Sequence, residues 1–155
     1  MNRTIINVII AVLVCCCVGL TARWVQTESL VEWYPTLVKS VLTPPNAVFP
    51  IVWGILYLCM GVSVGLMISV KKANKTIPMV LFVIQLLFNF LWSYTFFFLQ
   101  NPLLGLVNIL ILDIVVVWYS VCVYPIKKLS AWLFLPYVIW VIFATYLNAF
   151  IYFLN

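Results

Sequence analysis

Residues 33–57 read WYPTLVKSVLTPPNAVFPIVWGILY and join a polar, proline-rich segment to a long apolar one. The adjacent prolines at positions 44 and 45 cannot continue a helix, whereas Pro50 suits a helix's first turn, where proline is best tolerated. The stretch therefore predicts a proline-ordered loop that leads into a membrane helix. Trp53 and Tyr57 are four residues apart, so we expect both to project from one face of that helix, near its start.

The composition is that of a membrane protein. The 155 residues are 67% hydrophobic and 7% charged, whereas about 25% of a typical soluble domain is charged. A bilayer-spanning helix needs about 17 to 25 apolar residues, and an outer-membrane strand would instead alternate over about ten. Five segments meet the helix criterion: 5–22, 47–70, 77–99, 103–124 and 129–154. We predict a single domain over residues 1–155, an all-α bundle of five transmembrane helices, with a long loop over residues 23–46.

The basic residues indicate an orientation rather than a nucleic-acid partner. The net charge is +5, but the basic side chains sit at helix ends and form no patch with interleaved aromatic residues. Only Arg23 and Lys39 fall beyond the first apolar segment on the side of the long loop. The others fall on the side of the amino terminus: Arg3, Lys71, Lys72, Lys75, Lys127 and Lys128. The positive-inside rule therefore predicts that the amino terminus faces the cytoplasm.

Catalytic and metal chemistry have little support in the sequence. The chain has no histidine and only three acidic residues, which make no paired set of carboxylates. The five cysteines all lie within apolar segments and form no C-x-x-C pair, so we interpret them as small packing residues. The first apolar segment could also be a cleaved signal peptide with Arg3 as its charged region, but no A-x-A-like site follows it.

Polar residues recur on one face of the third segment. Gln85, Asn89, Ser93, Phe96 and Gln100 follow one another at steps of three or four, with Trp92 beside them. Buried amides need partners, so this face could make hydrogen bonds to other helices, or it could form the polar wall of an internal cavity. Both interpretations remain open at this stage.

Asp113 lies near the middle of the fourth segment, where an unpaired charge would cost at least about 2.5 kcal/mol. No basic residue lies inside another segment. We therefore expect either a protonated acid bonded to an amide, such as that of Asn89 or Asn148, or a role in proton or ligand handling.

Glycines of the second segment form a smooth stripe. Gly61 and Gly65 are four residues apart, and Gly54 lies seven residues before Gly61. Such a stripe lets another helix approach closely, either within the subunit or across a homodimer.

Two blocks of the sequence carry a family resemblance. The first loop of the TspO/MBR family reads roughly W-Y-x-x-L-x-K-P-x-W-x-P-P and leads into V-W-x-x-L-Y. The matching residues here are Trp33, Tyr34, Leu37, Lys39, Pro44, Pro45, Val52, Trp53, Leu56 and Tyr57, while Ser40 and Leu42 replace the family's proline and tryptophan. The second block is A-W-x-x-x-P-Y-x-x-W-x-x-F-A-T-Y over residues 131–146. The chain thus resembles this family from about Trp33 to its end.

The resemblance implies a ligand and a site. Members of the family bind porphyrins such as protoporphyrin, and many bind sterols and isoquinoline or benzodiazepine drugs. By position, the ligand-binding residues would be Tyr34, Pro44, Trp53, Tyr57, Asn89, Trp92, Phe96, Trp140, Ala144 and Leu147, with the long loop as a lid. The resemblance implies that porphyrin is bound as a ligand, and that the protein requires no cofactor or metal. The absence of histidine fits a metal-free tetrapyrrole better than haem, since the commonest axial ligand is missing.

The resemblance also leaves the activity open. It implies a sensory or regulatory homodimer in contact with membrane lipid, in the bacterial cytoplasmic membrane, or in the mitochondrial outer membrane if the source is eukaryotic. The alternatives are a transporter of porphyrin or lipid-like ligands, and a protein that degrades porphyrin in light and oxygen. In some bacterial members the tryptophans corresponding to Trp53 and Trp140 support that degradation.

Overall fold

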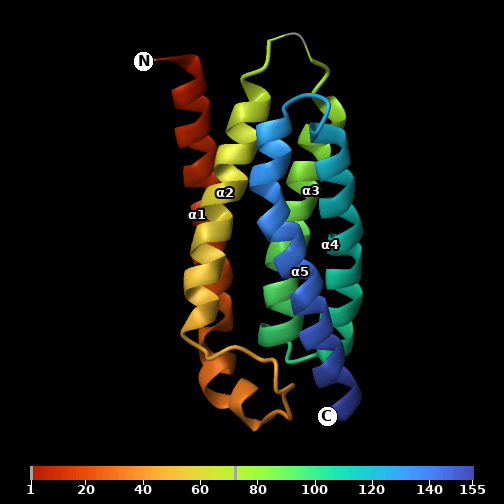
Figure 1. Ribbon diagram of the computed structural model, residues 1–155. Coiled ribbons are helices and arrows are strands. Elements are labelled where there is room, and N and C mark those ends of the chain that lie inside the picture. Colours follow the sequence, from red (N-terminus) through yellow and green to blue (C-terminus); the bar gives the residue numbers. More distant parts are fainter. Residues whose placement is uncertain (1, 72) are drawn as a thin grey trace.

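The computed structural model describes residues 2–71 and 73–155 and consists of long helices side by side (Figure 1). Five helical rods are each long and apolar enough to cross a membrane, and no strand occurs in the described residues. The prediction of an all-α bundle with five transmembrane helices is thereby confirmed. In chain order the elements are α1 (Arg3–Glu32), the short 3-10 helix η1 (Tyr34–Thr36), α2 (Val48–Ile68), α3 (Thr76–Trp92), its π-helical continuation η2 (Ser93–Phe98), α4 (Pro102–Val123) and α5 (Lys128–Leu154).

The connections alternate between the two ends of the bundle. The amino terminus lies at one end with the α2–α3 and α4–α5 connections, and we call this the amino-terminal end (Figure 1). The carboxyl terminus, η1 and the remaining loop of residues 37–47 lie at the other, which we call the loop end. Most basic residues therefore gather at the amino-terminal end, as the charge pattern indicates, although Lys72 lies outside the described residues. Which end faces the cytoplasm stays a prediction.

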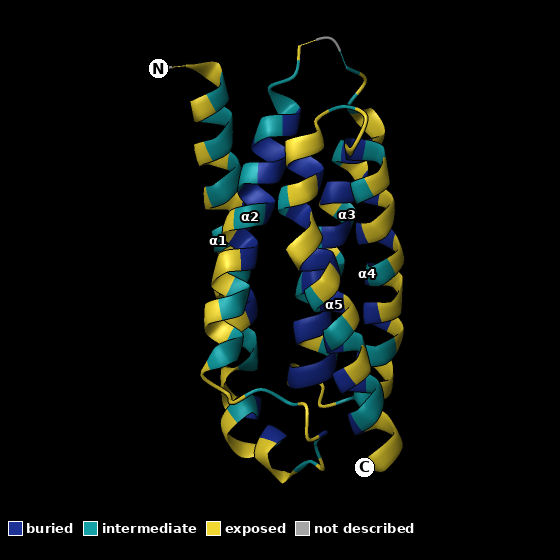
Figure 2. Ribbon diagram, viewed as in Figure 1, coloured by how far each residue is buried: buried dark blue, intermediate teal, exposed yellow. Residues whose placement is uncertain are grey.

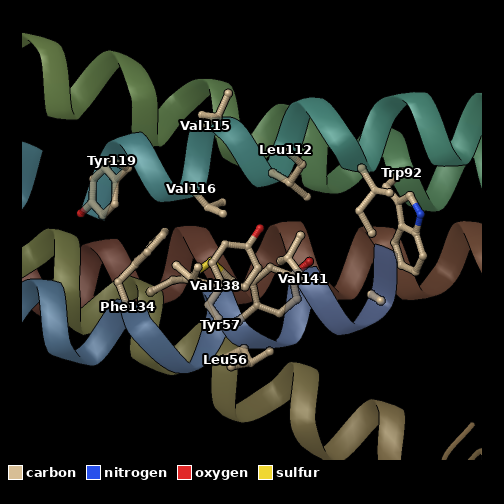
Figure 3. Packing of buried hydrophobic residues seen from close by; sticks show 14 of the residues in the cluster. Leu56, Tyr57, Trp92, Leu112, Val115, Val116, Tyr119, Phe134, Val138 and Val141 are labelled. Carbon is tan, nitrogen blue, oxygen red and sulfur yellow. The ribbon is translucent and has the colours of Figure 1, made fainter. Parts of the chain in front are cut away.

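The core lies where α2, α3, α4 and α5 face one another, while the outward faces are exposed, as expected for helices surrounded by lipid (Figure 2). Aliphatic residues of α4 face those of α5, and the ring of Tyr119 packs on Phe134 with centroids 4.4 Å apart (Figure 3). At the amino-terminal end, α2 and α5 are joined by serines. The Ser63 hydroxyl donates to the Ser130 carbonyl at 2.8 Å, and the Ser130 hydroxyl donates to the Ser63 carbonyl at 2.5 Å.

Two of the three α2 glycines bring α1 and α2 together. A Cβ at Gly65 would lie 2.5 Å from the Cα of Val8, and a Cβ at Gly61 would meet the Cα of Val12. The predicted close approach therefore occurs within the subunit. A Cβ at Gly54 would meet nothing within 4 Å, so this third glycine does not serve helix packing in the chain. The homodimer stays a prediction.

The structure corrects the boundary of the long loop. Residues 23–32 were expected in that loop, but they continue α1 to Glu32. The physical reason is that this polar stretch contains no proline or glycine, and the first helix breaker is Pro35. A helix of 30 residues is about 45 Å long, which exceeds the roughly 30 Å of a bilayer's hydrocarbon. The change from apolar to polar residues thus indicates where α1 leaves the membrane, and the helix itself ends further along the chain.

Candidate functional site

A cavity of about 650 Å³ lies in the half of the bundle nearer the loop end, between α1, α2, α3 with η2, and α5. This volume is within the usual range of small-molecule sites, about 300 to 1,000 Å³. Of the ten predicted ligand-binding residues, the structure brings eight together on the cavity wall. They are Tyr34, Trp53, Tyr57, Asn89, Trp92, Phe96, Ala144 and Leu147.

Two predicted residues do not line the cavity. Pro44 is half-buried in the loop of residues 37–47. Trp140 is also half-buried, and its ring packs edge-on against Phe49 of α2 with centroids 6.0 Å apart. The tryptophan pair that the resemblance connects with photochemistry is therefore divided, with Trp53 on the cavity wall and Trp140 outside it.

Flat aromatic faces make up one side of the cavity. Trp92 stacks on Phe96 with an interplanar angle of 22° and centroids 5.6 Å apart. Trp53 lies beside Trp92, at 6.2 Å between centroids, and beside Tyr57 at 5.8 Å. The π-helical turn of η2 contributes Phe96 and Phe97, which are both buried. Such neighbouring rings offer extended apolar surfaces on which a flat ligand can stack.

Amides of α3 and α5 supply some of the polar groups of the wall. Asn89 accepts a hydrogen bond from the Tyr57 hydroxyl and donates one to the Tyr137 hydroxyl at 2.9 Å. Asn148 accepts from the Trp92 indole N–H at 3.0 Å and donates to the Pro102 carbonyl at 2.8 Å. Asn89, on the polar face predicted for the third segment, therefore has both of the predicted roles. It makes hydrogen bonds to other helices, and it also lines the cavity.

The loop of residues 37–47 is tied to the outer part of α5. The side-chain amide of Asn155 accepts from the Val38 N–H at 2.8 Å and donates to the Val38 carbonyl at 3.1 Å. The hydroxyls of Ser40 and Tyr146 are hydrogen-bonded at 2.8 Å. Two independent contacts thus hold this loop across the end of the bundle.

Tyr34 follows α1 directly and closes the cavity from the loop end. Its ring centroid lies 5.7 Å from that of Phe97, and the Lys39 ammonium lies over the Tyr34 ring at 4.7 Å from the ring centroid. Burial raises the pKa of the Tyr34 hydroxyl above its ordinary value, because the charged form would lose its hydration. Tyr34 is therefore an uncharged aromatic residue of the cavity wall.

Sequence reasoning missed the whole wall that α1 contributes. Its lining residues include Gly19, Ala22, Arg23 and Gln26. The predicted loop over residues 23–46 includes Arg23 and Gln26, so the prediction does not use the helical spacing of three or four residues that links them to Gly19. If the predicted helix were continued to Pro35, the same spacing would place Gly19, Arg23 and Gln26 on one continuous helix face.

Asp113 is bonded differently from the expectation. Its Oδ2 accepts from the Thr145 hydroxyl of α5 at 2.7 Å, and neither Asn89 nor Asn148 is its partner. Those two amides are instead occupied by aromatic hydroxyls, an indole and a backbone carbonyl. Asp113 does not line the cavity, and no group of three or more potential metal ligands occurs in the described residues.

Comparison with known proteins agrees with this architecture. Residues 11–154 match the model of the TspO/MBR family. The chain is 37% identical to the Tryptophan-rich protein TspO of Chlorobaculum tepidum, over 96% of this chain and 95% of that protein. It is 38% identical to the Tryptophan-rich protein TspO of Archaeoglobus fulgidus, over 97% and 98% respectively. The Translocator protein of Homo sapiens is 33% identical over 86% of this chain and 79% of its own length. The chain therefore belongs to the TspO/MBR family of membrane proteins.

Proposed function

We propose that the protein is a membrane receptor that binds a tetrapyrrole, such as protoporphyrin, in the cavity and serves a sensory or regulatory role. The observation that carries this proposal is the cavity itself, in which neighbouring aromatic rings of α2, α3 and η2 lie beside a few amides and hydroxyls. Rings can stack on the faces of a flat apolar ligand while scattered polar groups fix its orientation.

The chemistry of the polar groups also favours a flat apolar ligand over a reactive substrate. The polar groups of the wall are mainly neutral amides and hydroxyls, which recognise shape and hydrogen bonding rather than drive acid–base chemistry. Sterol-like, isoquinoline and benzodiazepine molecules share this apolar and planar character, so we include them among the ligands to be tried.

The test is a titration of purified protein with protoporphyrin in the dark, followed by tryptophan quenching. We expect saturable quenching that is weakened in Trp53→Phe, because Trp53 lines the cavity. Trp140→Phe serves as the matched control, since Trp140 is an α5 tryptophan outside the lining. The absence of saturation would remove porphyrin as the ligand.

Light-driven degradation of the bound porphyrin is a second candidate function. It is favoured by the position of Trp53, which lies on the cavity wall within 6.2 Å of Trp92 between ring centroids. The same samples are illuminated in air and then without oxygen. Loss of Soret absorbance only in light and oxygen would support degradation, whereas stable absorbance would indicate that the protein only binds the porphyrin.

Movement of the ligand across the membrane of sealed vesicles that contain the protein would instead indicate a transporter.

A further inference from the structure

The cavity has one open side. Every lining residue from α3, η2 and α5 is buried. The exposed lining residues belong to α1, to the loop before α2 and to the start of α2: Leu20, Arg23, Val31, Asn46, Pro50 and Gly54. At Gly54 a Cβ would meet nothing within 4 Å, so the space beside α2 is open at that point. The mouth of the cavity therefore lies between the outer halves of α1 and α2.

Arg23 stands at this mouth and is the one charged residue among those that line the cavity. It follows the apolar part of α1 directly and precedes Trp24, whose side chain is 80% exposed. Tryptophan and arginine are typical of the level where the hydrocarbon meets the headgroups. The guanidinium is thus placed at the membrane surface while the cavity beside it reaches into the bundle.

Among the residues that the structure describes, no acidic side chain is paired with Arg23. The chain has only three acidic residues. Glu28 and Glu32 follow Arg23 by five and nine positions on the same helix, whereas helical side chains meet at spacings of three or four. Asp113 is bonded to Thr145 at the contact of α4 with α5. The forked donors of an arginine match a carboxylate well, so an acidic group from outside the chain would suit this position.

We propose that Arg23 binds an acidic group of the ligand at the cavity mouth. The ligand class is then a flat apolar molecule that carries a carboxylate at one edge, with the ring system inside and the acid at the membrane surface. This inference rests on the proposed function, because it assumes that the cavity takes such a ligand. It adds a site residue, a ligand orientation and a requirement for an acid.

The experiment compares protoporphyrin, a dicarboxylic acid, with its dimethyl ester, which keeps the ring but lacks the charges. Both are titrated into wild type, Arg23→Gln and Arg23→Lys. We expect Arg23→Gln to weaken binding of the acid about tenfold, the loss of one charge-assisted hydrogen bond, and to leave binding of the ester unchanged. Arg23→Lys should retain part of the affinity. Higher salt should weaken acid binding to wild type but not to Arg23→Gln.

Arg3→Gln is the matched control, because Arg3 begins the same helix at the opposite end of the bundle. It should bind both ligands as wild type does. Equal weakening of acid and ester by Arg23→Gln would show that Arg23 acts through packing, and no change with either ligand would show that it does not contact them. Both results would overturn the inference and leave the proposed function standing. If neither ligand saturates wild type, the proposed function falls and this inference falls with it.

Discussion

Replacing Asn89 with leucine should loosen the joint between three helices on the cavity wall. The Asn89 side chain is 2% exposed and connects the Tyr57 hydroxyl of α2 to the Tyr137 hydroxyl of α5. Leucine has a similar size, so the substitution removes two hydrogen bonds without leaving a large void. It also strands two hydroxyls on tyrosines that are 6% and 0% exposed.

The expected magnitude follows from those two bonds. Hydrogen bonds between membrane helices contribute about 0.6 kcal/mol on average and about 1.7 kcal/mol at most. Asn89→Leu should therefore lower the free energy of unfolding by about 1.2 to 3.4 kcal/mol. Tyr57→Phe removes one of the two bonds and should cost about half as much.

A double-mutant cycle separates this coupling from general damage. The free energy of unfolding is measured in mixed micelles for wild type, Tyr57→Phe, Asn89→Leu and the double variant. The two changes remove the same bond, so their combined effect should fall short of the sum by about 0.6 to 1.7 kcal/mol. Tyr152→Phe, at an exposed tyrosine near the end of α5, should add to Asn89→Leu within about 0.5 kcal/mol. If the free-energy changes of Tyr57→Phe and Asn89→Leu were also additive, the reasoning would be refuted.

Three further predictions concern the walls and the loop. Gly65→Leu should destabilise the protein by about 1 to 3 kcal/mol in the same unfolding assay, because its side chain would displace Val8 of α1; an unchanged stability would contradict the close approach. Trp53→Ala should weaken porphyrin affinity about two- to tenfold through lost stacking, with Trp140→Ala as the unaffected control, and equal effects in the two would contradict the lining. Asn155→Ala should raise the ligand's dissociation rate severalfold in stopped-flow quenching, because two hydrogen bonds to the loop are lost; an unchanged rate would argue against a lid.

Hydrophobicity alone predicted the fold because each span is a continuous apolar run. The five predicted segments agree with the helices to within two residues at most ends. The exception is α1, which the prediction ended at Ala22 and which continues to Glu32. An apolar run indicates which part of a helix is surrounded by lipid. Helix breakers such as proline indicate where the helical conformation ends. Pro35 was the better guide to that boundary.

Helical periodicity predicted much of the cavity wall, but it could not assign neighbours. Tyr137, Trp140 and Ala144 share one side of α5 by spacing, yet only Ala144 lines the cavity. Tyr137 points to Asn89 in the core, and Trp140 fills the contact with Phe49 of α2. Spacing along one helix tells which residues point the same way. It does not tell which neighbouring helix covers them, and that depends on how all five pack.

Two attachments of α1 hold in place the wall that this helix contributes to the cavity. Near the amino-terminal end, Gly65 lets α1 lie directly on α2, and Val8 fills the space that a side chain would take. Near the loop end, the Ser29 hydroxyl donates to the Phe97 carbonyl of η2 at 2.7 Å, so α1 is held there by the α3 side of the bundle. α1 is therefore attached to α2 near one end and to η2 near the other, and the part of α1 between these attachments includes the lining residues Gly19, Ala22 and Gln26. One side of the cavity is thus formed by the part of α1 that these two attachments hold in place, with Gly54 on the α2 side.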